Sequence, residues 1–148
     1  MDTIDRKILN LINHGLPVAE CPFQVVAESV GISEEETIER IHKLKESGII
    51  RRIGAVLDPR NMGWESTLCA AEIPLGRLEA FAEFVGGYTE VTHNYLREGQ
   101  PNCWFTLIAP SSERIAEIVA AIEKAFAVKI MNLPAARIFK IKVALEFP

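Results

Sequence analysis

The sequence predicts an α+β protein in which an N-terminal winged helix-turn-helix, residues 1–58, precedes a C-terminal ferredoxin-like βαββαβ domain, residues 59–148. Two observations lead to this prediction. Apolar residues recur at helical spacing in three short N-terminal segments, and the later segments run in the order strand, helix, strand, strand, helix, strand. A length of 148 residues is enough for two small domains.

The first part is built from short helices, predicted over residues 3–13, 23–30 and 33–47. Gly31 and Gly48 are placed to end the second and the third helix, because glycine readily adopts the left-handed conformation found after a helix. Ser33 and Glu36 have the spacing of a capping box at the start of the third helix. Residues 49–58 then alternate in polarity, which predicts a two-stranded wing.

The second part repeats a strand–helix order. Strands are predicted over residues 66–73, 90–97 and 102–109 and, interrupted near Pro134, within 129–146, and helices are predicted over residues 75–85 and 112–125. Two helices cover only one face of a four-stranded sheet. The other face is therefore expected to bind a ligand or a partner chain, and we predict dimerisation through it.

The charge distribution disfavours DNA binding. The chain has a formal net charge of −4, and residues 1–58 hold ten acidic and seven basic residues. The third helix, which in this fold approaches the bases, carries Glu34, Glu35 and Glu36 in its first turn. These carboxylates would face phosphates, although acids at a helix N-terminus also complement the helix dipole, and the sequence leaves both interpretations open.

The remaining composition indicates a cytoplasmic protein without a membrane span. No apolar run approaches the length of a transmembrane helix, and the acidic N-terminus does not resemble a signal peptide. Cys21, Cys69 and Cys103 are far apart in the sequence, so we expect reduced and mostly buried thiols. The three histidines and three cysteines have no metal-ligand spacing, so no metal site is predicted.

Four segments of the first part resemble the feast/famine, or Lrp/AsnC-type, transcription regulators: residues 4–9, 31–33, 40–44 and 48–50. This resemblance implies the same two-domain fold. It does not extend to the turn at residues 99–102, Gly-Gln-Pro-Asn, where amino-acid-binding members usually carry a Gly-Asp-Tyr-Asp-like sequence. Ordinary amino-acid sensing is therefore not expected.

The second part resembles one branch of that fold more closely, the sirohaem decarboxylases, at residues 66–71, 91–97, 102–107 and 133–141. The resemblance implies removal of CO2 from two acetate side chains of sirohaem to give didecarboxysirohaem, in alternative haem or nitrite-reductase haem biosynthesis. It also implies a carboxy-lyase that works as a pair of similar subunits, either a heterodimer or a homodimer. No cofactor is expected, because the iron belongs to the substrate.

Two alternatives stay open, and one of them rests on a departure from the branch. The branch leads us to expect a histidine or tyrosine in the loop before Asn102, but this chain has Gly99 and Pro101 there. The chain therefore also fits a non-catalytic subunit that completes another subunit's pocket. The second alternative is a DNA-binding regulator of the Lrp/AsnC type, including a haem-responsive one.

The predicted strand at residues 90–97 carries the candidate catalytic residues. Alternation places Val91, His93, Tyr95 and Arg97 on one face and Asn94 on the other. From the residues alone this cluster fits a dimer interface better than a catalytic site, and the resemblance reverses that preference. We predict that His93 is the general acid, since imidazole titrates near neutral pH, and that Arg97 orients the departing carboxylate. Axial ligation of the iron by His93 remains an alternative.

Substrate-binding roles are predicted for further residues by the chemistry of a flat macrocycle with a rim of carboxylates. They are Tyr95, Asn94, Trp104, Arg137, Lys140, Arg51 and Arg52. Trp104 would supply an apolar wall and the cations would hold carboxylates. For Arg51 and Arg52, a solvent-facing or phosphate-facing wing is the favoured interpretation.

Overall fold

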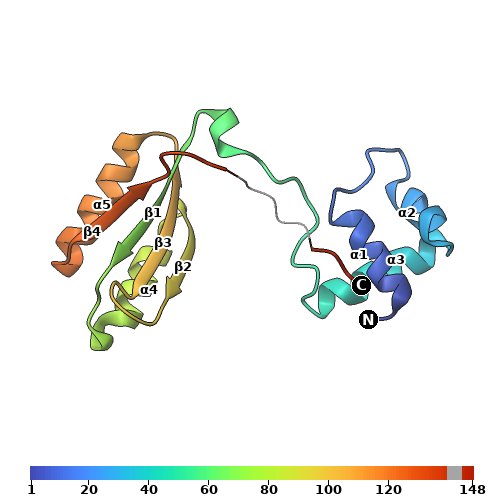
Figure 1. Cartoon of the computed structure of the whole chain (residues 1–148), viewed down its shortest axis with the longest axis horizontal. Coiled ribbons are helices and arrows are strands. Elements are labelled where there is room, and N and C mark those ends of the chain that lie inside the picture. The colour runs from blue at the N-terminus through green and yellow to red at the C-terminus, as the bar shows by residue number, and fades with distance from the viewer. Residues whose placement is uncertain (140–144) are drawn as a thin grey trace. The chain divides into compact units, whose positions relative to one another are not determined.

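The structure, a computed structural model, describes residues 1–139 and 145–148 (Figure 1). The described chain forms two compact units. The first contains residues 1–55 and the C-terminal residues 145–148, and the second is Val56–Phe139. No helix in these described residues is both long and apolar enough to span a bilayer.

The first unit contains three helices, α1 (Thr3–Ile12), α2 (Pro22–Val30) and α3 (Glu34–Glu46), as predicted. The Ser33 side chain accepts a hydrogen bond from the backbone N–H of Glu36 and so caps α3. The helices bury a small apolar core made of Ile8, Leu9, Val26, Ile41, Leu44 and Ile50. The helix-turn-helix is thus confirmed.

The predicted two-stranded wing is wrong. Residues 51–58 are all described and form no strand. Their side chains are exposed almost throughout, including Val56 and Leu57, so a hairpin here has no apolar face to bury. An isolated two-stranded hairpin is at best marginally stable in water, which explains why alternation alone misled the prediction.

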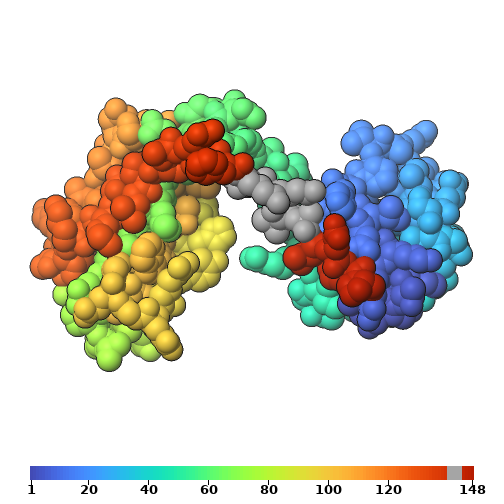
Figure 2. All heavy atoms as spheres, viewed as in Figure 1, coloured from blue at the N-terminus to red at the C-terminus, as the bar shows by residue number. Residues whose placement is uncertain are grey.

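The C-terminal residues pack on α1 and not on the second unit, so the predicted domain boundary at 59–148 assigned them to the wrong part. Asn10 clamps the backbone of Phe147, donating from Nδ2 to its carbonyl and accepting from its N–H, both at 2.9 Å. Asn13 donates to the Leu145 carbonyl at 2.6 Å and Arg6 donates to that of Pro148 at 2.8 Å. The Phe147 ring packs against the first core. Figure 2 shows these residues, in red, lying against the helices of the first unit.

Replacement of Asn10 by alanine is expected to destabilise the first unit by about 1–3 kcal/mol, because two backbone groups of a partly buried residue lose their partner. Hydrogen exchange should show faster exchange of the Phe147 amide and of the amides of α1. The Gln24→Ala variant is a suitable control, since Gln24 is exposed and its side chain donates to neighbouring Glu28. Unchanged protection of the Phe147 amide in Asn10→Ala would contradict the expectation.

The second unit is the predicted ferredoxin-like domain. Its elements follow in the order β1 (Glu65–Ala71), α4 (Leu78–Gly86), β2 (Val91–Leu96), β3 (Cys103–Ala109), α5 (Ser112–Phe126) and β4 (Ile130–Pro134). The strands form one antiparallel sheet in the order β2-β3-β1-β4. Short 3-10 turns at Pro59–Met62 and Leu75–Arg77 precede β1 and α4.

The core of this unit lies between one face of the sheet and the two helices. Phe81 of α4 is fully buried at its centre, with its ring centroid 5.1 Å from that of Phe126 and 6.2 Å from that of Phe105. Two of the three cysteines also lie here, and burial raises the pKa of Cys69 to about 11. These two thiols are buried as predicted, whereas Cys21 is exposed.

Candidate functional site

One face of the sheet is not covered by the helices, and we call it the open face. Along β3, Cys103, Phe105 and Leu107 are buried against the helices, while Trp104 and Thr106 alternate with them and are only partly buried. Figure 1 shows that α4 and α5 belong to this same half of the molecule, behind the strands. The open face is therefore the place where the predicted ligand or partner can approach the sheet.

A β-bulge in β2 brings His93 and Tyr95 to the open face. Val91 pairs with Leu107 and packs against the core, whereas His93 pairs with Thr106 and Tyr95 with Trp104. The register shifts between Val91 and His93. The prediction that Val91 shares a face with the histidine is thus wrong, because simple alternation does not allow for the extra residue of a bulge.

The structure brings four of the predicted site residues together on this face. The ring centroids of His93 and Tyr95 are 5.8 Å apart. The guanidinium carbon of Arg97 lies 5.3 Å from the ring centroid of Trp104. The Trp104 indole N–H donates to the Pro101 carbonyl at 2.9 Å, which fixes the ring. An imidazole, a phenol, a guanidinium and a flat apolar ring thus lie next to one another.

Asn94 does not join this cluster. It pairs with the buried Phe105, and its side-chain amide donates to the Ala82 carbonyl of α4 at 3.3 Å. The side chain therefore lies on the helix side of the sheet, as the alternation indicated, so it is not on the open face with the other predicted site residues. It holds the edge strand β2 against α4 instead.

Arg137 follows β4, the other edge strand, and its guanidinium carbon is 4.8 Å from the ring centroid of the exposed Phe139. Strands β2 and β4 run in opposite directions, because every neighbouring pair of strands in the order β2-β3-β1-β4 is antiparallel. Arg97 and Arg137 therefore follow opposite ends of the sheet. Lys140 lies outside the described residues.

Arg51 and Arg52 are exposed and belong to the first unit. Their predicted contact with a ligand stays a prediction. In the described chain, no group of three or more His, Cys, Asp or Glu side chains is arranged to hold a metal ion.

Asn102 is a site-supporting residue that the sequence analysis missed. Its side-chain oxygen accepts from the Ile73 N–H and its amide donates to the Ile73 carbonyl, both at 2.8 Å. These bonds tie the turn between β2 and β3 to the end of β1 and so support Arg97 and Trp104 at that turn. An asparagine beside a predicted turn was the available signal, but only the fold shows its partner.

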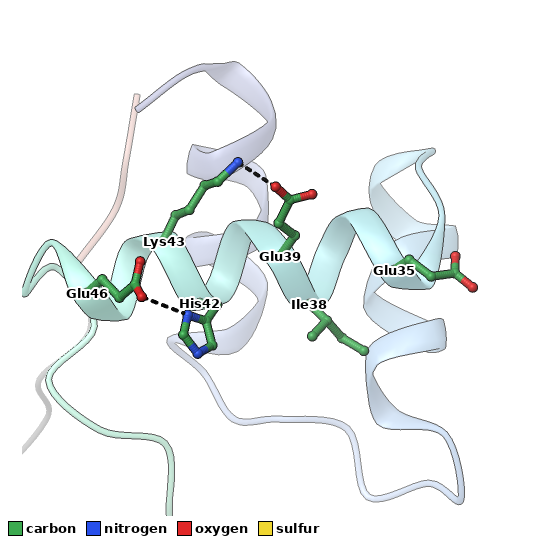
Figure 3. A pocket seen from close by; sticks show the side chains of 6 residues that line it. All are labelled: Glu35, Ile38, Glu39, His42, Lys43 and Glu46. Atoms are coloured by element: carbon green, nitrogen blue, oxygen red, sulfur yellow. Dashed lines mark hydrogen bonds and ion pairs between the residues drawn. The ribbon is translucent and has the colours of Figure 1, made fainter.

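The exposed surface of α3 is predominantly acidic. A shallow pocket on it is lined by Glu35, Ile38, Glu39, His42, Lys43 and Glu46 (Figure 3). Two of the positive or potentially positive groups there are paired, Lys43 with Glu39 at 2.6 Å and His42 with Glu46 at 3.3 Å. The surface that approaches DNA in helix-turn-helix proteins thus offers few free cations.

Arg40, another base of α3, is turned toward α1. Its guanidinium donates to Asp2 at 2.7 Å, to Asp5 at 2.9 Å and to Glu36 at 2.8 Å. These carboxylates raise the pKa of Arg40, and Arg40 together with the Asp5 backbone N–H lowers the pKa of Asp2. Arg40 therefore joins α3 to the start of α1, and its guanidinium is not free to bind phosphates. The sequence does not reveal this pairing, because only the fold brings Asp2 and Asp5 beside Arg40.

Comparison with known proteins agrees with both parts of the fold. Residues 5–51 match the model of the siroheme decarboxylase NirDL-like HTH domain, and residues 61–140 match the AsnC-like ligand binding domain. The siroheme decarboxylase alpha subunit of Nitratidesulfovibrio vulgaris is 42% identical over 143 residues, which cover 97% of this chain and 81% of that protein. The chain belongs to the sirohaem decarboxylase family.

Solved structures relate this sirohaem decarboxylase family member to enzymes and regulators alike. A siroheme decarboxylase NirDL in co-complex with an iron-uroporphyrin III analogue is 34% identical, with a TM-score of 0.74 over 97% of this chain and 48% of that one. An AsnC family transcriptional regulator from Agrobacterium tumefaciens is 25% identical, with a TM-score of 0.80 over 98% of this chain and 96% of that one. The resemblance inferred from the sequence is confirmed, and so is the Lrp/AsnC-type fold.

Proposed function

We propose that this chain is a sirohaem decarboxylase subunit that removes CO2 from two acetate side chains of sirohaem and forms didecarboxysirohaem. The observation that carries the proposal is the uncovered sheet face with His93, Tyr95, Arg97 and Trp104, in a chain 42% identical to a siroheme decarboxylase alpha subunit. A flat macrocycle can lie on such a face, with Trp104 beneath it and Arg97 near one of its carboxylates.

The proposed reaction breaks the bond between the acetate methylene and its carboxylate. His93, protonated, donates a proton to the macrocycle beside the acetate, and the protonated ring then accepts the electron pair as CO2 leaves. Restoring the ring places the proton on the methylene carbon, which becomes a methyl group. Each acetate thus consumes one proton and releases one CO2, as a carboxy-lyase requires. No further cofactor enters, and the iron is part of the substrate.

Arg97 is proposed to orient the departing carboxylate. Its guanidinium lies beside the Trp104 ring at the end of β2, where a charge-assisted hydrogen bond to a carboxylate above the sheet is geometrically available. The open face leaves the substrate exposed on one side when the chain is alone. A second subunit of the same fold, identical or similar to this one, is proposed to cover it and to exclude water.

The deciding experiment is anaerobic incubation of the purified protein with sirohaem, alone and together with a second subunit of the same family, followed by mass analysis of the tetrapyrrole. Loss of the mass of two CO2 molecules would support the proposal and would show whether this chain suffices. Activity only with the partner would support a heterodimer. Binding without mass loss under both conditions would overturn the proposal.

The structural likeness to an AsnC family transcriptional regulator makes a DNA-binding regulator, including a haem-responsive one, the second candidate. The acidic surface of α3 argues against it. We expect duplex DNA to bind no more tightly than nonspecific complexes do, with a Kd of about 10⁻⁴–10⁻⁶ M.

Replacing Glu35, Glu39 and Glu46 together by glutamine should tighten this nonspecific binding, because three carboxylates no longer repel phosphates. The charge-matched control replaces the exposed Glu79, Glu83 and Glu98 of the second unit. Fluorescence anisotropy at several salt concentrations measures both. A wild-type Kd in the nanomolar range with a steep salt dependence would favour the regulator instead.

A further inference from the structure

The bulge in β2 decides which residues face the open side of the sheet. Val91 pairs with Leu107 in the core, and two residues later His93 pairs with Thr106, one position back along β3. Without the extra residue, His93 would share the face of Val91 and point toward the helices. Bulges often re-aim a side chain next to an active site. The residue between these two positions is Thr92.

Thr92 also contacts the histidine directly. Its hydroxyl oxygen lies 3.0 Å from Nδ1 of the His93 ring. A hydroxyl can donate to the bare Nδ1 of neutral imidazole, and it can accept from Nδ1–H of the imidazolium. The same contact is thus available before and after the imidazole gives up a proton. In both states Nδ1 is engaged, which leaves Nε2 as the nitrogen that exchanges a proton.

The Tyr95 ring further restricts the orientation of the His93 imidazole. The two ring centroids are 5.8 Å apart and the planes are inclined by 30°. The imidazole is therefore held by the Thr92 hydroxyl at one ring nitrogen and flanked by the Tyr95 ring. Both contacts come from β2 itself, so they do not require a second subunit to form.

We propose that Thr92 is a positioning residue for His93, which both forms the bulge and fixes the imidazole so that Nε2 performs the proton transfer. This inference rests on the proposed function insofar as it assigns His93 the role of proton donor. The contact between the hydroxyl and Nδ1 stands independently of the reaction. A threonine in a strand also has an ordinary explanation, since β-branched residues favour extended backbone.

Two substitutions separate the positioning role from strand propensity. Thr92→Val keeps the β-branched shape and removes the hydroxyl, whereas Thr92→Ser keeps the hydroxyl and removes the branch. If Thr92 positions His93, Thr92→Val lowers the single-turnover rate of decarboxylation about tenfold, the effect of one lost orienting hydrogen bond. Thr92→Ser then stays within about twofold of wild type, and binding of an iron-uroporphyrin is unchanged in both. If propensity alone matters, the order of the two variants is reversed, which overturns the proposal.

A measurement that needs no activity completes the test. The ¹⁵N NMR signals of the His93 ring in the full-length protein report whether Nδ1 is hydrogen-bonded. They should agree between wild type and Thr92→Ser and differ in Thr92→Val. Thr89→Val is the matched control, because the Thr89 hydroxyl donates to Glu90, outside the cluster.

The activity assay and the NMR comparison can contradict the two proposals independently of each other. If no variant and no wild-type preparation decarboxylates sirohaem, the proposed function falls, while the NMR comparison still decides whether Thr92 holds the ring. Ring signals in Thr92→Val that match those of wild type would overturn the positioning role, whatever the activity.

Discussion

Replacing His93 by alanine is expected to lower the rate of sirohaem decarboxylation by about 10²–10⁴-fold, the usual contribution of a positioned general acid. Binding of an iron-uroporphyrin should stay within about threefold of wild type, because a proton donor contributes to the transition state more than to ground-state binding. Single-turnover kinetics on enzyme saturated with sirohaem measure the first quantity. A spectrophotometric titration measures the second.

His42→Ala provides the matched control for this experiment. His42 is exposed on α3 in the first unit, beside Glu46, and the substitution removes the same group. It should leave the rate unchanged. If His93→Ala weakens binding strongly and changes the absorbance of the bound iron porphyrin, the histidine is an axial ligand and not the acid. A rate within a few-fold of wild type with normal binding would exclude both roles.

Replacing Phe81 by alanine is expected to lower the free energy of unfolding of the second unit by about 3–5 kcal/mol. Phe81 is fully buried and makes edge-to-face contacts with Phe105 and Phe126, so truncation leaves a cavity in the middle of an aromatic cluster. Denaturant unfolding followed by tryptophan fluorescence measures the change. Both tryptophans, Trp64 and Trp104, belong to this unit, so the signal reports its unfolding specifically.

Phe84→Ala tests whether burial, and not the loss of any aromatic ring from α4, causes this effect. Phe84 is one turn along the same helix and is 39% exposed, although its ring also contacts Phe126 and Tyr88. A clearly smaller loss of stability is expected. Equal losses in the two variants would mean that the cluster is not centred on Phe81.

The sequence pattern was sufficient to predict strands that bury only one face and helices whose ends are fixed by nearby residues. β3 reads buried, partly buried, buried along its whole length, and its alternation was visible in the residues from Cys103 to Ala109. The helix boundaries followed from Ser33, Gly31 and Gly48, which act through nearby backbone groups. Local rules of this kind do not depend on knowing the fold.

Features that depend on contacts distant in sequence were not predictable in the same way. The bulge at Thr92 places Val91 and His93 on opposite faces of the sheet. No residue type in that segment indicates a bulge. The ion pairs of Arg40 with Asp2 and Asp5 join residues more than 30 positions apart. The C-terminal residues were assigned to the second domain, because their contact with Asn10 spans 137 positions.

The sequence predicted most of the residues that lie together in the candidate site, but not the contacts that position them. His93, Tyr95, Arg97 and Trp104 do lie together on one face, because strand pairing and alternation constrain them. Asn94 was included for its chemical suitability, although alternation placed it on the other face of the strand, where the structure has it. The supporting role of Asn102 follows from two hydrogen bonds to a residue 29 positions away, which the sequence alone cannot indicate.

The clamp between Asn10 and Phe147 has a consequence for how such chains can be joined in tandem. It returns the C-terminus to the first unit, which also holds the N-terminus, and the two ends lie near each other there (Figure 1). A second copy fused after Pro148 would begin beside the helix-turn-helix of the first copy, so a short joining peptide suffices.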